Sequence, residues 1–188
     1  GAMGTEADGM IHAKAWGILP KDRVEIKTKK ENVDYRKLIA AGSCFAEGEE
    51  VIDYGFVERW ILGLEEKYGV EVMQVGYDRY NAISTVQKLE ANSMECVEVK
   101  QHSSVLHPPT KLLREAILKK EFAYDENRLL EINFQNARCT EDTNLNKYVN
   151  KKRSAGKVDM VVSTIIAVYL MQQAMLDNSE LDWGIQVI

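Results

Sequence analysis

The sequence predicts an α/β domain in which short strands alternate with amphipathic helices. Three observations favour this class. Strand-like and helix-like patterns alternate along most of the chain. Residues 70–100 follow the order strand, helix, strand, and a helical crossover makes the two strands parallel. Residues 157–176 predict a helix that is apolar on nearly every face, which has to be buried against a sheet.

The composition suits a single domain with a substantial core, since 45% of the 188 residues are hydrophobic. No apolar run is expected to approach the length needed to span a bilayer, and the N-terminus lacks the pattern of a secretion signal, so a soluble intracellular protein is expected. Residues 1–4 have the composition of an expression scar, which leaves residues 5–188 as the predicted domain. The formal net charge of -5 argues against a generic nucleic-acid coat.

The first element expected is a strand over residues 10–19, which alternate in part between apolar and polar side chains and end at Pro20. The turn signal Asp8-Gly9 before it normally joins the two strands of a hairpin. Only the second strand is evident, so the first strand is expected to be missing from the chain.

Three further segments complete the predicted N-terminal part. The highly charged residues 21–31 are expected to form a loop, and residues 33–42 a short helix ended by a glycine. Residues 51–69 predict a longer amphipathic helix that ends just before a glycine. Asp53, at the start of this helix, is best interpreted as its N-cap.

A lone carboxylate, Asp78, follows the apolar run in the sequence VMQVGYDRYNA at residues 72–82. Its position favours helix capping, because aspartate is a preferred N-cap. Open α/β sheets also place ligand sites at the carboxyl ends of their strands. Asp78 is therefore a candidate metal ligand, with capping as the competing interpretation.

The C-terminal half predicts further helices. Residues 108–121 form a helix with prolines at its start, where proline is tolerated. Residues 122–139 predict a short strand followed by a helix. Zinc chemistry is not expected, because the three cysteines and three histidines show none of the spacings of zinc motifs. The cysteines are interpreted as inert thiols.

Asp159 lies in the first turn of the last predicted helix, where the helix dipole favours a carboxylate. A deeply packed helix would hold this group rigidly, as a metal ligand requires. The sequence KYVNKKRSAGK, at residues 147–157, comes directly before it and carries five basic residues and no acid. This run is either a phosphate-binding patch or a solvated loop.

Three segments occur in an order that resembles the C-terminal nuclease domain of tailed-phage terminase large subunits. They are the YDR sequence around Asp78, residues 101–112, and the Lys-x-Asp start of the last helix at Asp159. The similarity covers most of residues 10–175. It implies a ribonuclease H-like fold, with a mixed central sheet flanked by helices and acidic residues gathered at one edge.

The resemblance also implies a divalent-metal-dependent endonuclease that cuts concatemeric DNA during genome packaging. Asp78 and Asp159 would be its catalytic, metal-binding acids, holding Mg²⁺ or Mn²⁺, with two ions in the intact protein. Carboxylates suit this role because hard cations prefer oxygen ligands. Lys151, Lys152 and Arg153 would contact double-stranded DNA. The implied partners are the terminase ATPase domain, the small terminase subunit and the portal protein, in the cytoplasm of a bacterial host and without a membrane.

The chain departs from the family pattern at its first acidic motif, an aspartate on the opening strand. Asp8 matches the hairpin turn instead, which predicts weak metal binding or an inactive fragment. An ATPase is not expected, because no GxxxxGK[ST] sequence is present. Two alternatives remain open. One is a resolvase- or transposase-like nuclease of the same fold; the other is a non-catalytic docking module in which Asp78 and Asp159 only cap helices.

Overall fold

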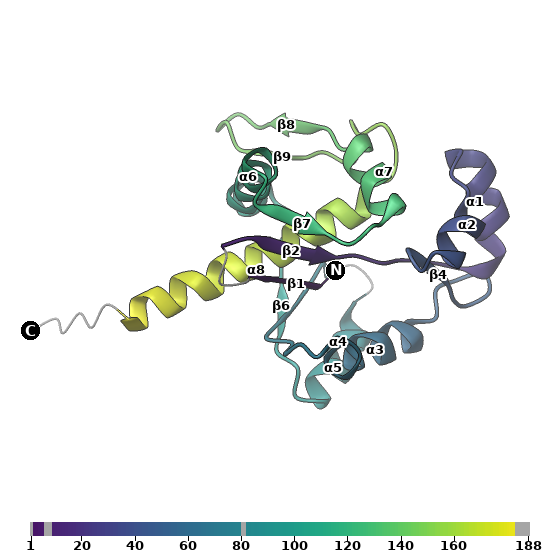
Figure 1. Cartoon of the computed structure of the whole chain (residues 1–188), viewed down its shortest axis with the longest axis horizontal. Coiled ribbons are helices and arrows are strands. Elements are labelled where there is room, and N and C mark those ends of the chain that lie inside the picture. The colour runs from purple at the N-terminus through teal and green to yellow at the C-terminus, as the bar shows by residue number, and fades with distance from the viewer. Residues whose placement is uncertain (1, 6–8, 80–81, 183–188) are drawn as a thin grey trace, which may run out of the picture.

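The computed structural model describes residues 2–5, 9–79 and 82–182. Figure 1 shows short strands and helices grouped around one long helix, α8 (Asp159–Asp182). In the described part, the strands form one three-stranded sheet and three two-stranded sheets. The architecture is α/β, as the sequence predicts.

The three-stranded sheet is mixed. Its central strand, β2 (Ile11–Lys14), pairs antiparallel with β1 (Ala2–Thr5) and parallel with β7 (Phe122–Tyr124). The sequence predicted no strand before the Asp8-Gly9 turn, and the structure differs there. The edge of a strand offers unpaired N–H and C=O groups that any extended segment can bond, which explains why residues 2–5 pair with β2. None of these four residues carries a carboxyl group, so β1 does not supply the family's first acid.

A parallel two-stranded sheet and three helical segments follow. In order they are β3 (Gly17–Leu19), η1 (Lys21–Arg23), α1 (Val24–Glu31), α2 (Tyr35–Ala40) and β4 (Cys44–Ala46). The loop predicted over residues 21–31 is wrong. Val24 is the buried residue of α1, so this helix lacks the apolar stripe by which a surface helix is detected.

The next segment contains the predicted strand–helix–strand unit. Its elements are α3 (Tyr54–Leu62), α4 (Leu64–Tyr68), β5 (Val75–Tyr77), α5 (Ile83–Ala91) and β6 (Cys96–Glu98). The predicted parallel pairing of β5 with β6 is confirmed. The single helix predicted over residues 51–69 is divided at Gly63 into α3 and α4.

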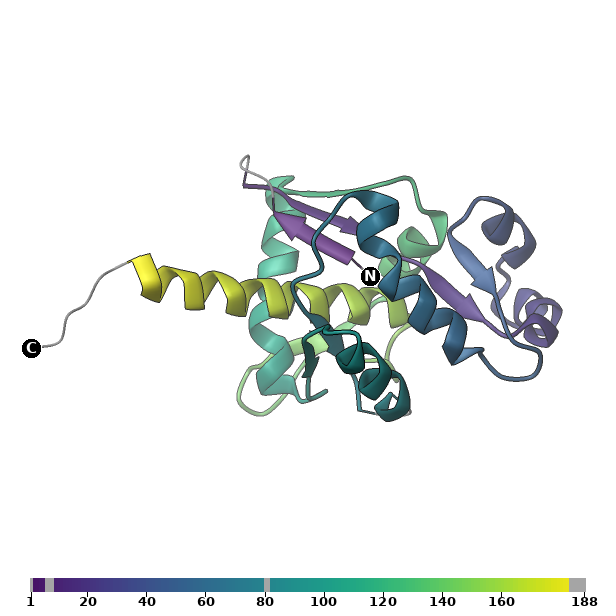
Figure 2. The same ribbon diagram turned by 90° about the horizontal axis from the view of Figure 1, so that it is seen from below.

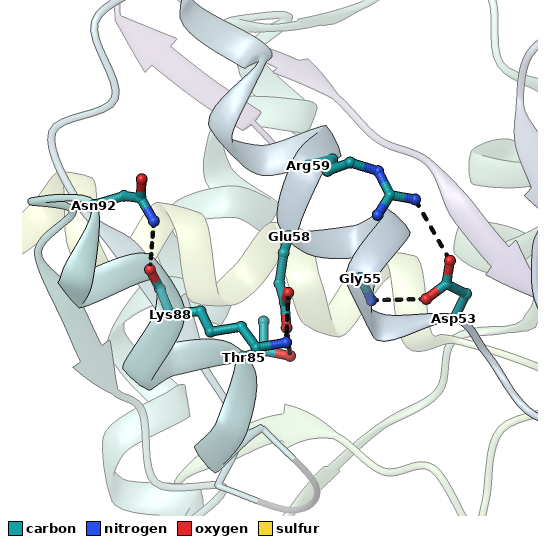
Figure 3. Close-up of polar contacts among 7 residues, drawn as sticks. All are labelled: Asp53, Gly55, Glu58, Arg59, Thr85, Lys88 and Asn92. Carbon is teal, nitrogen blue, oxygen red and sulfur yellow. Dashed lines mark hydrogen bonds and ion pairs between the residues drawn. The ribbon is translucent and has the colours of Figure 1, made fainter.

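Polar contacts fix the start of α3 and join it to α5 (Figure 3). Asp53 is the N-cap of α3, as predicted, and its Oδ1 accepts a hydrogen bond from the Gly55 amide at 2.9 Å. Glu58 is only 8% exposed, and its carboxylate lies 2.9 Å from Lys88 Nζ. Thr85 Oγ1 donates to the same carboxylate at 3.3 Å. Pairing and hydrogen bonding compensate the burial of this charge.

The C-terminal half contains the remaining elements. After α6 (Ser103–Lys119) and β7 come α7 (Arg128–Asn136), β8 (Cys139–Glu141), β9 (Lys147–Val149) and α8. The hairpin of β8 and β9 was not predicted. The prolines lie inside α6 rather than at its start, because the helix begins directly after His102, whose Nδ1 accepts the Ser104 amide at 3.3 Å.

The buried residues form two hydrophobic clusters, and α8 contributes to both. The larger cluster joins α8 to α6, through residues such as Leu113 and Ile165. The smaller one gathers β3, β4, α2 and α7 around Cys44 and Leu130, and it includes Met160 of α8. The first turn of α8 therefore lies where the two clusters meet.

Beyond this body, α8 continues on its C-terminal side, as both Figure 1 and Figure 2 show. Over the 19 residues Asp159–Asp177, its mean hydropathy of 1.4 is high enough for a membrane span by length and composition. The prediction that no apolar run reaches this length is therefore wrong for α8. The buried core helix of a globular domain passes the same test, and 44% of this window is buried in the fold.

Candidate functional site

Asp159 is the first residue of α8, and a neighbouring helix fixes its position. Asn133 of α7 is 3% exposed, and its Oδ1 accepts a hydrogen bond from the Met160 amide at 3.2 Å. The Asn133 Nδ2 donates to the Leu129 carbonyl at 2.8 Å, so this side chain is held at both ends. Asn133 thereby bonds one of the amides that a helix start leaves unpaired. The backbone that carries Asp159 is anchored to the core.

The carboxylate of Asp159 is itself accessible, with 65% of its side chain exposed. Its Oδ1 lies 3.4 Å from Nζ of Lys151, one of the basic residues predicted to contact DNA. The structure thus brings a predicted acid and a predicted base together. A cation at Asp159 would have to compete with this ammonium group.

The basic residues before α8 occupy an ordered turn. Asn150 Oδ1 accepts hydrogen bonds from the amides of Lys152 and Arg153 at 3.0 and 3.2 Å. The Asn150 Nδ2 donates to Thr140 Oγ1 at 3.2 Å, which ties the turn to β8. Lys152 and Arg153 are exposed, and neither forms a side-chain ion pair within the described residues. Their charges are available to an anionic ligand.

Asp78, the other predicted acid, directly follows β5 and is exposed. It is not the N-cap of the next helix, because α5 begins at Ile83 and is preceded by Ala82 at the N-cap position. Asp78 therefore does not cap α5 as this helix is described. β5 packs on α8 so closely that a Cβ added at Gly76 would lie 2.5 Å from Cγ2 of Ile166. Asp78 thus directly follows a strand that contacts the helix carrying the other acid, two residues after the point of contact at Gly76.

The donor set of a divalent-metal site is incomplete in the part of the chain that the structure describes. No group of three or more His, Cys, Asp or Glu side chains there is arranged to hold a metal ion. Asp78 and Asp159 offer oxygen ligands of the type that Mg²⁺ and Mn²⁺ prefer. Two carboxylates fall short of the three acidic motifs expected from the family.

A cavity of about 210 Å³ opens beside Asp159, between the start of α8 and the pair α1 and α2. Its charged and polar lining includes Lys27, Tyr35 and Lys157. Burial, a hydrogen bond to Glu31 and the nearby charges of Glu31 and Asp159 raise the pKa of Tyr35 well above its ordinary value. Lys27 and Tyr35 were not predicted as site residues. The charged segment that contains Lys27 was expected to be a loop, and only tertiary packing brings α1 toward α8.

The described strands and the long core helix with an acid at its start form an α/β domain, and solved structures share this fold. The crystal structure of the HK97 bacteriophage large terminase matches with a TM-score of 0.79 and 19% identity, over 89% of this chain and 35% of that chain. The large terminase nuclease from thermophilic phage G20c matches with a TM-score of 0.50 and 19% identity, over 63% of this chain and 62% of that chain.

The family model for the terminase large subunit, endonuclease domain, matches residues 2–175. The chain therefore belongs to this family, and the resemblance seen in the sequence is confirmed. A comparison with curated proteins finds no significant match. The chain spans about a third of the length of the HK97 large terminase.

Proposed function

We propose that this chain is the divalent-metal-dependent endonuclease domain of a phage packaging terminase and that it cuts concatemeric double-stranded DNA. Family membership supports the nuclease class. The observation that supports the assignment of the site is the packing of β5 on α8 at Gly76 and Ile166, because Asp78 directly follows β5 and Asp159 begins α8.

Asp78 and Asp159 are the proposed ligands of Mg²⁺ or Mn²⁺. Such an ion, when bound, lowers the pKa of an attacking water and stabilises charge on the phosphate oxygens. Asp159 first has to release Lys151, which costs little because an exposed ion pair contributes at most about 1 kcal/mol. With two carboxylates in place of three, we expect this chain to bind metal weakly.

Lys151, Lys152 and Arg153 are the proposed contacts to the DNA backbone. Neutralising phosphates with basic side chains releases condensed counterions, which provides affinity without sequence specificity. The turn held by Asn150 presents these residues directly before the helix that starts with Asp159. DNA bound there would pass close to the proposed metal ligands.

The proposed partners are those of a packaging motor: the ATPase domain, the small terminase subunit and the portal protein. The proposed location is the cytoplasm of an infected bacterium. A resolvase or transposase relative is disfavoured by the family match. A non-catalytic docking module is the second candidate, favoured by the lack of a three-acid group among the described residues.

The test is cleavage of supercoiled plasmid with Mn²⁺, for the wild-type chain and for Asp159→Asn. We expect nicked and linear products from the wild type and a loss of at least about a hundredfold in rate for the variant, because a metal ligand is removed. Asp177→Asn, which changes an exposed acid farther along the same helix, is the matched control and should cleave normally.

A direct measurement of Mn²⁺ binding, by calorimetry or electron paramagnetic resonance, accompanies the cleavage assay because weak activity is expected. Asp159→Asn and Asp78→Asn should each lower Mn²⁺ affinity. If both variants bind Mn²⁺ as the wild type does and neither loses cleavage, the proposed site is wrong. If the wild type itself does not cleave plasmid, the docking module becomes the better assignment.

A further inference from the structure

The cavity beside Asp159 is lined by several segments that lie far apart in the chain, among them β3, α1, α2, α7 and the start of α8. Lys157 and Asp159 lie on the side of α8, and Lys27 and Tyr35 come from α1 and α2. Figure 1 shows α1 and α2 at the end of the molecule where α8 begins, opposite its projecting C-terminal end. The cavity therefore adjoins the proposed metal ligand but is separate from the turn at residues 151–153.

Lys27 is held in place at the cavity wall. Its side chain is 29% exposed, and its Nζ lies 3.3 Å from Oε1 of Glu31, one turn farther along α1. The other carboxylate oxygen of Glu31 accepts a hydrogen bond from the Tyr35 hydroxyl at 2.6 Å. This chain of contacts orders the lysine before any ligand binds, and less conformational freedom is lost on binding as a result.

The charges around the cavity favour an anion. Lys27 and Lys157 line the cavity together with one acid, Asp159. Lys27 is paired with Glu31 and Asp159 with Lys151, so the ammonium of Lys157 leaves an excess of positive charge at the cavity. If a divalent cation occupies Asp159, that negative charge is offset and the excess positive charge increases. A lysine ammonium binds phosphate oxygens as a compact point charge. The small volume suits one phosphate with its sugar rather than a whole duplex.

We propose that Lys27 contacts the DNA backbone and, with Lys157, holds a phosphodiester in this cavity next to Asp159. The inference rests on the proposed function in taking DNA as the ligand. It adds α1 to the binding surface, so that the DNA would run from the basic turn across the start of α8 to α1. Lys27 would position the strand beside the proposed metal ligands without taking part in the cleavage itself.

The test measures binding of a short DNA duplex by fluorescence anisotropy at several salt concentrations, in EDTA, so that cleavage plays no part. Lys27→Gln should reduce the slope of log K against log salt by about 0.9 and weaken binding about threefold at moderate salt, as expected for one lost phosphate contact. Lys27→Arg keeps the charge and should preserve the slope. Lys30→Gln is the matched control, because it removes an exposed lysine of α1 that does not line the cavity.

Equal effects of Lys27→Gln and Lys30→Gln would overturn the inference, since the change would then reflect net charge alone. An unchanged slope in Lys27→Gln, or no binding of the duplex by the wild type, would also overturn it. If Lys27→Gln lowers the slope while Asp159→Asn still cleaves, the proposed metal site fails and the phosphate cavity stands. If the slope is unchanged while Asp159→Asn loses cleavage, the cavity fails and the nuclease stands. Circular dichroism of each variant verifies that it is folded.

Discussion

Lys151 connects the two kinds of residue that the proposed nuclease needs. It belongs to the basic turn, yet its ammonium lies 3.4 Å from a carboxylate oxygen of Asp159. A divalent cation and this ammonium compete for the same oxygen. Metal binding should therefore release Lys151 toward the DNA. In the metal-free protein, the Lys151 ammonium and the Asp159 carboxylate should neutralise each other.

Replacing Lys151 by glutamine should change metal and DNA affinity in opposite directions. Mn²⁺ should bind more tightly, by less than about fivefold, because an exposed ion pair contributes under about 1 kcal/mol. Duplex DNA should bind more weakly, because a phosphate contact is lost. Calorimetry with Mn²⁺ and anisotropy with DNA measure the two effects, and Lys152→Gln, which should weaken only DNA binding, is the control. Weaker Mn²⁺ binding in Lys151→Gln would contradict the competition.

At the level of elements, periodicity predicts those that bury a stripe of side chains. The parallel β5–α5–β6 unit follows from this signal, whereas the core helix α8 follows from a run that is apolar on nearly every face. The helix α1 buries Val24 alone, and β8 exposes two of its three residues, so neither element has the apolar pattern by which it could be detected. The two acids are recognisable from sequence motifs. Lys27 becomes a candidate site residue only through the packing of α1 near α8, which no local pattern encodes.

Gly76 sets the distance between two of these elements. A Cβ at this position would lie 2.5 Å from Cγ2 of Ile166 and 2.9 Å from Cδ1 of Leu170, both buried in the core. Contacts this short force the strand and the helix apart. Because Asp78 follows β5, the same displacement would move it relative to Asp159.

We expect Gly76→Ala to lower the free energy of unfolding by about 1–3 kcal/mol, as overpacking of a core does. Cleavage should fall more than stability alone explains, because one acid is displaced. Ile166→Ala removes the nearest methyl group, so the double variant should be less destabilised than the sum of the two single changes. Urea denaturation of all four proteins gives the coupling energy. Additive effects would show that β5 and α8 do not press on each other at this point.

At the level of the whole molecule, polar contacts fasten the β8–β9 hairpin to α6. Ser103 Oγ donates to Asp142 at 2.6 Å, and the Lys147 amide donates to His107 Nδ1 at 2.7 Å. The basic turn follows β9 directly, so the position of the hairpin also determines where the turn lies. Asp142 therefore links the stability of the fold to the placement of the proposed DNA contacts.

The stability of the protein should depend on pH through Asp142. Hydrogen bonds from the side chains of Ser103 and Asn146, together with the amides of Asn146 and Asn144, hold the pKa of this carboxyl well below its usual range. A carboxyl whose pKa is lower in the folded state stabilises the fold above its unfolded pKa, about 3.9, and this contribution is lost as the pH falls toward the folded value. Asp142→Asn should therefore have a lower Tm than the wild type at pH 7. The difference should shrink progressively below about pH 4.

Thermal melts of the two proteins between pH 7 and pH 3 measure this dependence, with Asp177→Asn as the control for loss of an exposed acid. Asp142→Asn keeps a side-chain oxygen that accepts from the two amides but loses the acceptor for Asn146 Nδ2, so the pH dependence of the Tm difference, rather than its size, reports the charge. A Tm difference that is constant over the whole range would contradict the charge dependence and leave packing as its cause. A difference that fades with acid, together with weaker DNA binding at neutral pH, would show that this one carboxylate both stabilises the hairpin and sets the position of the basic turn.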